Sequence, residues 1–470
     1  MDATKVLDFF KEITYIPRES GHEEKMTAYL CKFAADRGLE CRRDRVGNVV
    51  IVKPAAPGKE NVPVLVLQAH QDMVCEKTGG SGHDFSKDPI KYEIEDGWMI
   101  AKETTLGADD GIGIAACLAL LDGSLDAGKI ECLFTISEET GMDGAFALEG
   151  GFFDGKTLIN LDSEDEGQLF VGCAGGLDTT ARFRFVREEI HEGSKILKLR
   201  IFNAVGGHSG DDINKERANA LQQLCRFLYS EKDWQLLSIS GGNKPNAICR
   251  EAEAVVAAAD PDGLTEAFKS FGKTLSGEFA VSDPDIKAEI LPWSCGCKAV
   301  AGGRQFISTL FALPHGVAAM SMDIPGLVET STNLAAVRQL APDVLEVVTS
   351  QRSSVTSALH AMASKVEACF RLGGFETERS SEYPGWKPDM NSRILDVCVK
   401  AYRRLFNAEP EVKAIHAGLE CGLFLDKFPD LDMISFGPTL RGVHAPGEKL
   451  ELASLDKFWA LLEYVVCNFS

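Results

Sequence analysis

The segment that decides the fold is Val64-Leu65-Val66-Leu67-Gln68-Ala69-His70-Gln71-Asp72, an apolar run that leads directly into a histidine and an aspartate. A short run of valine and leucine is typical of a strand buried on both faces, as in parallel sheets. Ligands of open α/β sheets bind beyond the carboxyl ends of the strands. His70 and Asp72 are therefore expected at the functional edge of a sheet.

Four more segments place acidic or histidine side chains next to an apolar run. They are residues 130–136 followed by Glu138-Glu139, residues 157–161 followed by Asp162, residues 431–437 followed by a loop with His444, and Asp109-Asp110 before the apolar stretch 111–121. Any one of them has an ordinary explanation, because turns favour Asp and Glu. Together they indicate a cation-binding site, because adjacent carboxylates repel each other when desolvated and a bound cation relieves that repulsion.

Two histidines and at least three carboxylates exceed the three protein ligands typical of one catalytic zinc ion. They suit two borderline or hard divalent ions, which predicts a two-metal hydrolase. These patterns alone leave open which member of Asp109-Asp110 and which member of Glu138-Glu139 would touch a metal ion.

The chain closely resembles the aminoacyl-histidine dipeptidases, which belong to a dizinc exopeptidase superfamily that also holds peptidase T and glutamate carboxypeptidases. The resemblance covers essentially the whole chain, and the motifs occur in the family's order. The matching segments are residues 67–74, 104–113, 138–142, 160–164, 206–210, 415–422 and the loop with His444.

The resemblance implies a set of five metal ligands. His70 and Asp162 would hold one zinc ion, Glu139 and His444 would hold the other, and Asp109 would bridge them. Co²⁺ and Mn²⁺ are the expected substitutes for Zn²⁺. The family also implies a cis peptide bond after Asp109.

Two further carboxylates would act beside the metal ions. Asp72 would accept a hydrogen bond from the far ring nitrogen of His70 and so fix its tautomer. Glu138 would be the general base that takes a proton from the metal-bridging water and returns it to the leaving amine.

Five residues are expected to contact the substrate. His208 would stabilise the oxyanion, and Arg352 with Asn246 would bind the substrate's carboxylate, for which a planar guanidinium is suited. His416 and Glu420 have the i, i+4 spacing of a helical zinc site. We expect them instead to form a hydrogen-bonded pair that recognises the amino end. Arg352 could equally be a surface arginine at a strand end.

The expected fold class is α/β, with a mixed, mostly parallel sheet, flanking helices and an inserted α+β lid of two lobes. The catalytic domain would comprise residues 1–176 and 383–470, with residues 177–382 as the lid. The lid is predicted to contain strands at 179–186, 195–202, 306–313, 332–337 and 344–351 and helices at 214–229 and 354–372.

Composition favours a cytoplasmic enzyme. No basic apolar leader follows the first residues, and the longest apolar stretch is too short to span a membrane. The 14 cysteines show no paired zinc-site spacing, and we expect reduced thiols. A net charge of −21 argues against a nucleic-acid partner. The expected state is a monomer or homodimer, with His208 supplied within one chain.

The predicted activity is hydrolysis of unblocked dipeptides with a C-terminal histidine, including the β-alanyl-histidine type. The alternatives are a broader dipeptidase or an N-acyl amino acid amidohydrolase, because a two-metal centre hydrolyses amides in general. A non-catalytic metal-binding protein is disfavoured, since storing metal would require neither Glu138 nor Asp72.

Overall fold

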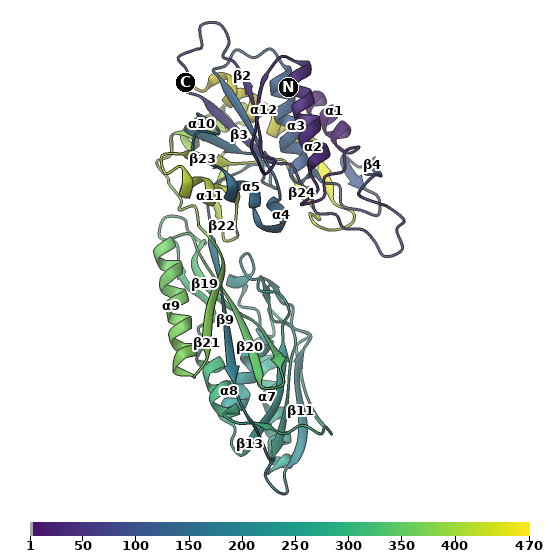
Figure 1. Ribbon diagram of the computed structural model, residues 1–470, viewed down its shortest axis with the longest axis vertical. Coiled ribbons are helices and arrows are strands. Elements are labelled where there is room, and N and C mark those ends of the chain that lie inside the picture. Colours follow the sequence, from purple (N-terminus) through teal and green to yellow (C-terminus); the bar gives the residue numbers. More distant parts are fainter. Residues whose placement is uncertain (1–2) are drawn as a thin grey trace. The chain divides into compact units, whose positions relative to one another are not determined.

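The computed structural model describes residues 3–470, which form two compact units (Figure 1). Unit 1 comprises the chain up to Gly172 together with Trp386–Ala414 and Leu419–Ser470. Unit 2 comprises Cys173–Gly385 and Ile415–Gly418.

Unit 1 is built on an eight-stranded mixed sheet in the order β1-β2-β6-β3-β7-β23-β8-β22. Its four central strands, β6, β3, β7 and β23, run parallel to one another. The pairs β1–β2, β2–β6 and β23–β8 outside them are antiparallel. Strands β3 (Leu65–His70) and β6 (Ile130–Thr135) are buried at every residue, because helices flank the sheet. The sheet is therefore of the α/β type, with its carboxyl-end edge available for a site.

The strands expected before His70, Glu138, Asp162 and the His444 loop are present as β3, β6, β7 and β23. Its strands are β1 (Glu40–Arg43), β2 (Val49–Lys53), β3, β4 (Tyr92–Glu95), β5 (Trp98–Ala101), β6, β7 (Thr157–Asn160), β8 (Gln168–Cys173), β22 (Glu411–Ile415), β23 (Asp432–Ser435), β24 (Leu440–Arg441) and β25 (Lys449–Glu451). Its helices are α1 (Thr4–Ile13), α2 (Glu24–Asp36), α3 (Ala108–Asp122), α4 (Glu138–Gly141), α5 (Asp143–Ala147), α10 (Arg393–Phe406), α11 (Glu420–Lys427) and α12 (Leu452–Asn468).

Unit 2 contains a nine-stranded sheet with two halves. Strands β16, β11, β15 and β13 form one half and β19, β20, β9 and β21 the other, with β18 paired to β19. The halves meet at a single registered pair, Gly241 of β13 and Val337 of β19. Helices α6, α7, α8 and α9 pack on these strands around one apolar core. This is the two-lobed α+β lid expected from the sequence.

The elements of unit 2 lie in the middle of the chain. Its strands are β9 (Gly175–Arg184), β10 (Arg187–Glu188), β11 (Lys195–Phe202), β12 (Gly207–His208), β13 (Trp234–Gly241), β14 (Ala247–Ile248), β15 (Ala252–Ala258), β16 (Lys287–Pro292), β17 (Ala299–Val300), β18 (Gly316–Met320), β19 (Val328–Ala341), β20 (Val344–Ser353) and β21 (Glu376–Tyr383). Its helices are the 3₁₀ helix η1 (Ile213–Lys215), α6 (Ala220–Ser230), α7 (Pro261–Glu278), α8 (Gly303–Ala312) and α9 (Thr356–Leu372).

One predicted strand of the lid is wrong. Residues 306–313 belong largely to helix α8, in which Phe306, Ile307 and Leu310 are fully buried. Their spacing places them on one helical face, which packs against α6 and β13. A short apolar run does not by itself distinguish a buried helix from a strand.

The predicted helix at 214–229 begins later than expected. Residues Ile213–Lys215 form a separate 3₁₀ turn, and α6 starts at Ala220. The side chain of Asn219 accepts a hydrogen bond from the backbone N–H of Gln222 and so caps the helix at that point.

The segment Ile415–Gly418 groups with unit 2, although it lies within the range 383–470 expected for the catalytic domain. The backbone N–H of Ala174 donates to the carbonyls of both Ile415 and Ala417, and these bonds attach the segment to the start of β9.

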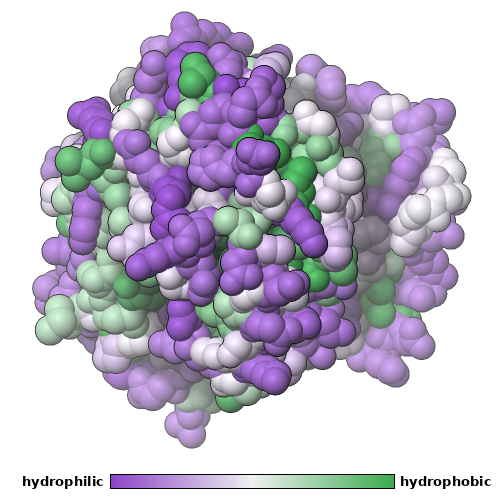
Figure 2. All heavy atoms as spheres, turned by 90° about the horizontal axis from the view of Figure 1, so that it is seen from below, coloured by the Kyte–Doolittle hydropathy of each residue, from purple (hydrophilic) through white to green (hydrophobic). Residues whose placement is uncertain are grey.

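Hydrophilic residues cover most of the face shown in Figure 2, with apolar residues scattered among them. Within residues 3–470, none of the helices combines the length and apolar character needed to cross a membrane.

Candidate active site

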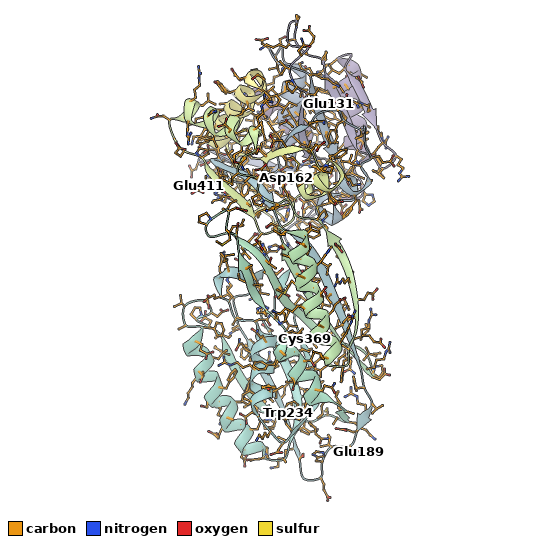
Figure 3. The ribbon with its side chains drawn as sticks, turned by 90° about the vertical axis from the view of Figure 1, so that its left-hand side faces the viewer. Glu131, Asp162, Glu189, Trp234, Cys369 and Glu411 are labelled. Atoms are coloured by element: carbon orange, nitrogen blue, oxygen red, sulfur yellow. The ribbon has the colours of Figure 1, made fainter. Side chains whose placement is uncertain are left out.

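His70 ends strand β3 at the carboxyl edge of the sheet and is fully buried. Its Nε2 lies 3.0 Å from Asp109 Oδ1 and 3.6 Å from Asp162 Oδ1. Asp162, labelled in Figure 3, follows β7, the parallel neighbour of β3. The parallel register therefore delivers both side chains to one place, as the sequence predicts.

Asp109 lies between two imidazoles. Its Oδ1 faces His70, and its Oδ2 lies 3.2 Å from His444 Nε2. The same His444 nitrogen is 2.9 Å from Glu139 Oε1. All five metal ligands implied by the resemblance, with Asp162 as the fifth, thus come together in unit 1.

The carboxylate of Asp110 is held by backbone N–H groups. Its Oδ1 accepts the N–H of Gly113 at 3.0 Å, and its Oδ2 accepts the N–H of His70 at 3.3 Å. The peptide bond between Asp109 and Asp110 is cis, as the resemblance implies. Asp110, His70 and Asp162 also lie close enough together to hold one metal ion. We favour Asp109, because neither carboxylate oxygen of Asp110 lacks a hydrogen bond.

Asp72 connects His70 to the acidic pair. Its Oδ1 lies 3.3 Å from His70 Nδ1, a long contact that is best described as electrostatic, and accepts the N–H of Glu138 at 3.0 Å. Its Oδ2 accepts the hydroxyl of Ser20 and the N–H of Glu139. Burial alone would raise the pKa of Asp72, but these contacts outweigh it and lower the pKa to about 2. Asp72 is therefore a fixed negative charge.

The electrostatics of the site favour a bound cation. Burial lowers the pKa of His70, yet the carboxylates of Asp162, Asp109 and Asp72 raise it well above its usual value. Hydrogen bonds that His444 donates to the carboxylates of Asp109 and Glu139 raise the pKa of His444 to about 11. An environment that holds protons on imidazole so firmly attracts positive charge of any kind, and imidazole with carboxylate is a donor set suited to Zn²⁺ and similar ions.

Glu138 lies beside this centre with a raised pKa. The main cause is burial, and the negative charges of Glu420, Glu139 and Asp109 add to it, whereas His70 lowers it. Glu420 is fully buried and accepts hydrogen bonds from Gln68 Nε2 at 2.6 Å and from Thr135 Oγ1 at 2.9 Å. Burial raises the pKa of Glu420 to about 7. A carboxyl group with a raised pKa is suited to proton transfer near neutral pH.

Unit 2 brings together three of the predicted substrate-binding residues. Arg352, on β20, donates from Nη1 to the Tyr383 hydroxyl at 2.9 Å, and its Nη2 lies 3.5 Å from His208 Nε2. The backbone carbonyl of His416 lies next to Gly210, two residues after His208. Asn246 is exposed and holds this loop through its backbone carbonyl, which accepts the N–H of Ser209.

Arg352 is a buried guanidinium without a carboxylate partner. Its residue is 7% exposed, and its Nε has no hydrogen-bond partner. Within residues 3–470, the hydrogen-bond partners of its side chain are the Tyr383 hydroxyl and His208 Nε2. The carboxylates of Asp178 and Asp211 interact with it through charge but form no salt bridge with it. A buried, unpaired cation of this kind is a ready binding site for an anionic group.

The expectation that His416 and Glu420 form a hydrogen-bonded pair is wrong. His416 precedes helix α11, and its Nε2 is 2.7 Å from the hydroxyl of Ser331. Glu420 begins that helix and bonds to Gln68 and Thr135 instead. The i, i+4 spacing has no helical meaning here, because the first of the two residues is not in the helix.

Several residues of the site carry no signal that the sequence reasoning used. Arg18 and Glu448 are buried next to the metal-ligand loops, and Tyr383 and Ser331 hold Arg352 and His416. Glu448 lies four residues after His444, and that proximity could have suggested it. Arg18 stands in an ordinary polar segment far from every motif, so only the fold reveals it.

The two adjacent aspartates are expected to behave differently when each is made neutral. Asp109→Asn should weaken binding of divalent ions at least about tenfold, because it removes the charge between His70 and His444. Asp110→Asn should lower Tm but change metal affinity less than about threefold, because an amide oxygen still accepts one backbone N–H. Zn²⁺ titration of the metal-free proteins and calorimetric Tm measure both effects. A larger metal loss in Asp110→Asn would make Asp110 the ligand.

Comparisons with known proteins agree with this geometry. The family described as Peptidase family M20/M25/M40 matches residues 66–468. The cytosol non-specific dipeptidase of Escherichia coli K12 is 42% identical over 464 residues, which cover 97% of this chain and 95% of that protein. The crystal structure of aminoacylhistidine dipeptidase from Vibrio alginolyticus matches with a TM-score of 0.91 and 39% identity, covering 99% of this chain and 96% of that one.

More distant structures share the fold alone. The aminopeptidase PepT from Bacillus cereus has a TM-score of 0.59 at 16% identity, with 99% of this chain and 98% of that one covered. Because the family match spans most of the chain and a relative above 40% identity covers nearly all of it, this protein belongs to the peptidase family M20/M25/M40.

Proposed function

We propose that this protein is a two-metal dipeptidase that hydrolyses the peptide bond of unblocked dipeptides. The observation that carries the proposal is the position of Asp109 between His70 and His444, with Asp162 and Glu139 beside them. Relatives at 42% and 39% identity over nearly the whole chain are named as dipeptidases, which supports the same reaction class.

His70 and Asp162 would hold one ion and Glu139 and His444 the other, with Asp109 shared between them. Zn²⁺ is the proposed metal, with Co²⁺ and Mn²⁺ as substitutes, because the donors are imidazole nitrogen and carboxylate oxygen. Bound ions of this kind acidify water and polarise the substrate carbonyl.

Glu138 is the proposed general base. It takes a proton from the attacking water and later delivers it to the leaving amine. Glu420 is fully buried, so we propose that it acts on Glu138 through its charge and does not touch the substrate's amino end. Asp72 holds the backbone of Glu138 and Glu139 and orients His70.

The lid would supply the substrate contacts. Arg352 is the proposed partner of the dipeptide's free carboxylate, with Asn246 as an added donor. His208 would stabilise the oxyanion from within the same chain. Burial lowers the pKa of His416 to about 4, with a further lowering by Arg352, so His416 would meet the substrate as a neutral imidazole.

There are three alternatives for the substrate. A preference for Xaa-His is supported by the resemblance to aminoacylhistidine dipeptidase, with 39% identity. A broader dipeptidase is supported by the E. coli relative, which is named a non-specific dipeptidase. An N-acyl amino acid amidohydrolase is the third alternative.

The cytosolic description of the E. coli relative supports a cytoplasmic location. The proposed partner is a dipeptide, with neither nucleic acid nor membrane, and the protein would act as a monomer or homodimer.

Glu138→Ala is expected to lower kcat by roughly 10²–10⁴-fold while both metal ions stay bound, because it removes proton transfer but no metal ligand. Metal analysis and dipeptide hydrolysis on the same preparation test this. Glu149→Ala, which removes an exposed carboxylate elsewhere in unit 1, is the control and should leave both unchanged. Loss of metal in Glu138→Ala would show that Glu138 and Glu139 exchange roles.

Arg352→Met is expected to lower kcat/KM for free dipeptides by roughly 10- to 100-fold, since a charged hydrogen bond contributes about 1.5–3 kcal/mol. The same change should alter hydrolysis of the corresponding dipeptide amides less than about threefold, because they lack the carboxylate. Arg379→Met is the matched control, as Arg379 already pairs with Glu367 within unit 2. An equal loss on both substrates would exclude carboxylate binding by Arg352.

Activity on a substrate panel separates the specificity alternatives. For an Xaa-His enzyme, kcat/KM on β-Ala-His and Ala-His should exceed that on Ala-Ala and Ala-Leu by at least about tenfold. Equal values would establish the broader dipeptidase, and faster cleavage of N-acetyl amino acids would establish the amidohydrolase.

A further inference from the structure

We propose that Glu448 is a positioning residue that holds Asp109 and His444 in place relative to each other, and so sets the affinity of the metal centre. This inference rests on the proposed two-metal function. Glu448 itself touches neither ion in this proposal, and it acts through the two loops that carry the ligands.

The Glu448 carboxylate is saturated with backbone hydrogen bonds from the loop that ends in Asp109. Its Oε2 accepts the N–H groups of Leu106 at 2.8 Å and Gly107 at 3.0 Å. Its Oε1 accepts those of Ala108 at 2.8 Å and, more weakly, Asp109 at 3.4 Å. Four donors on two oxygens leave no oxygen directed at a metal ion, and they fix the backbone that presents the Asp109 carboxylate.

Glu448 also belongs to the loop that carries His444. Both residues lie in the hairpin between β24 and β25, and a turn links the N–H of Glu448 to the carbonyl of Ala445. The Glu448 carbonyl accepts the N–H of Ala101, the last residue of β5. His444 has a φ of 63°, a left-handed conformation that a histidine keeps only where the surroundings hold it. One side chain therefore connects the two ligand loops.

A buried cation, Arg18, interacts with the Glu448 carboxylate through charge. Arg18 is 2% exposed and donates to the carbonyls of Gln71, Asp72 and Gly107. Arg18 thus ties the end of β3 to the same loop that Glu448 holds. Because Arg18 and Glu448 carry opposite charges, the position of the Asp109 loop depends on the charge of Glu448 as well as on its size. Replacing the carboxylate of Glu448 by an amide would turn an NH₂ group toward backbone donors.

Glu131 offers a matched control for a buried carboxylate without a link to the ligands. It is fully buried on β6 and accepts the N–H groups of Asp154 at 2.7 Å and Gly155 at 3.0 Å. It lies near the start of the parallel strands, whereas Asp162 follows the end of β7, and Figure 3 shows the two residues well separated within unit 1. Glu131 also forms ion pairs with Arg42 at 2.9 Å and Lys129 at 3.0 Å. All of these contacts lie near the starts of β6 and β7, whereas Glu139 and Asp162 follow the ends of these strands.

The experiment compares Glu448→Gln with Glu131→Gln in the full-length protein. Zn²⁺ binding to the metal-free proteins is measured by titration calorimetry, together with Tm, kcat and KM for a cleaved dipeptide. Both variants should lower Tm. Glu448→Gln alone should weaken binding of at least one ion by about 10- to 100-fold and lower kcat, with KM changed less than about threefold. Glu131→Gln should keep Zn²⁺ affinity within about twofold.

Glu448→Asp covers the case in which Glu448→Gln does not fold. It keeps the charge but withdraws the carboxylate by one methylene, so it should reach fewer of the four N–H groups and give an intermediate loss of Zn²⁺ affinity. Unchanged affinity in a folded Glu448 variant, or an equal loss in Glu131→Gln, overturns the proposal. Failure of the wild-type protein to bind Zn²⁺ or cleave dipeptides would instead refute the proposed function.

Discussion

The parallel pairing of β3 with β6 and β7 is the constraint on which the active site depends. Because the three strands run in the same direction and in register, the segments that follow them leave the sheet at one edge. His70, Glu138 with Glu139, and Asp162 are thereby gathered from positions far apart in the chain. An antiparallel arrangement of the same strands would place them at opposite ends of the sheet.

Gathering carboxylates in this way creates a second constraint, which is electrostatic. Each carboxylate has its own hydrogen-bond partners. Asp72 accepts backbone N–H groups, Asp109 contacts two imidazoles, and Glu448 accepts four backbone N–H groups. The donors to Asp72 and Glu448 include backbone N–H groups, which cannot bind a metal ion, whereas the imidazoles next to Asp109 are themselves possible metal ligands. The structure therefore separates carboxylates that stabilise the fold from those that remain available to a cation.

The sequence predicted the central strands and the gathering of the ligands because both follow from local patterns, namely apolar runs and the residues after them. The prediction of secondary structure and side-chain partners was less accurate where tertiary contacts determine them. Residues 306–313 lie largely in a helix, because one of its faces packs on α6 and β13. His416 and Glu420 have different hydrogen-bond partners, because only Glu420 lies in helix α11. The choice between Asp109 and Asp110 came from the resemblance, and the role of Arg18 follows from folded contacts between distant segments, which no local pattern encodes.

The short segment Ile415–Gly418 makes the lid less modular than a simple insertion. The chain passes between the units at four places, near Gly172, Gly385, Ala414 and Gly418, and the last two passages enclose only four residues. His416 in this segment shares a hydrogen bond with the hydroxyl of Ser331, which lies in the inserted sequence. An evolutionary exchange of lids between relatives would have to transfer this tetrapeptide together with the insert, or else rebuild the partner of its histidine.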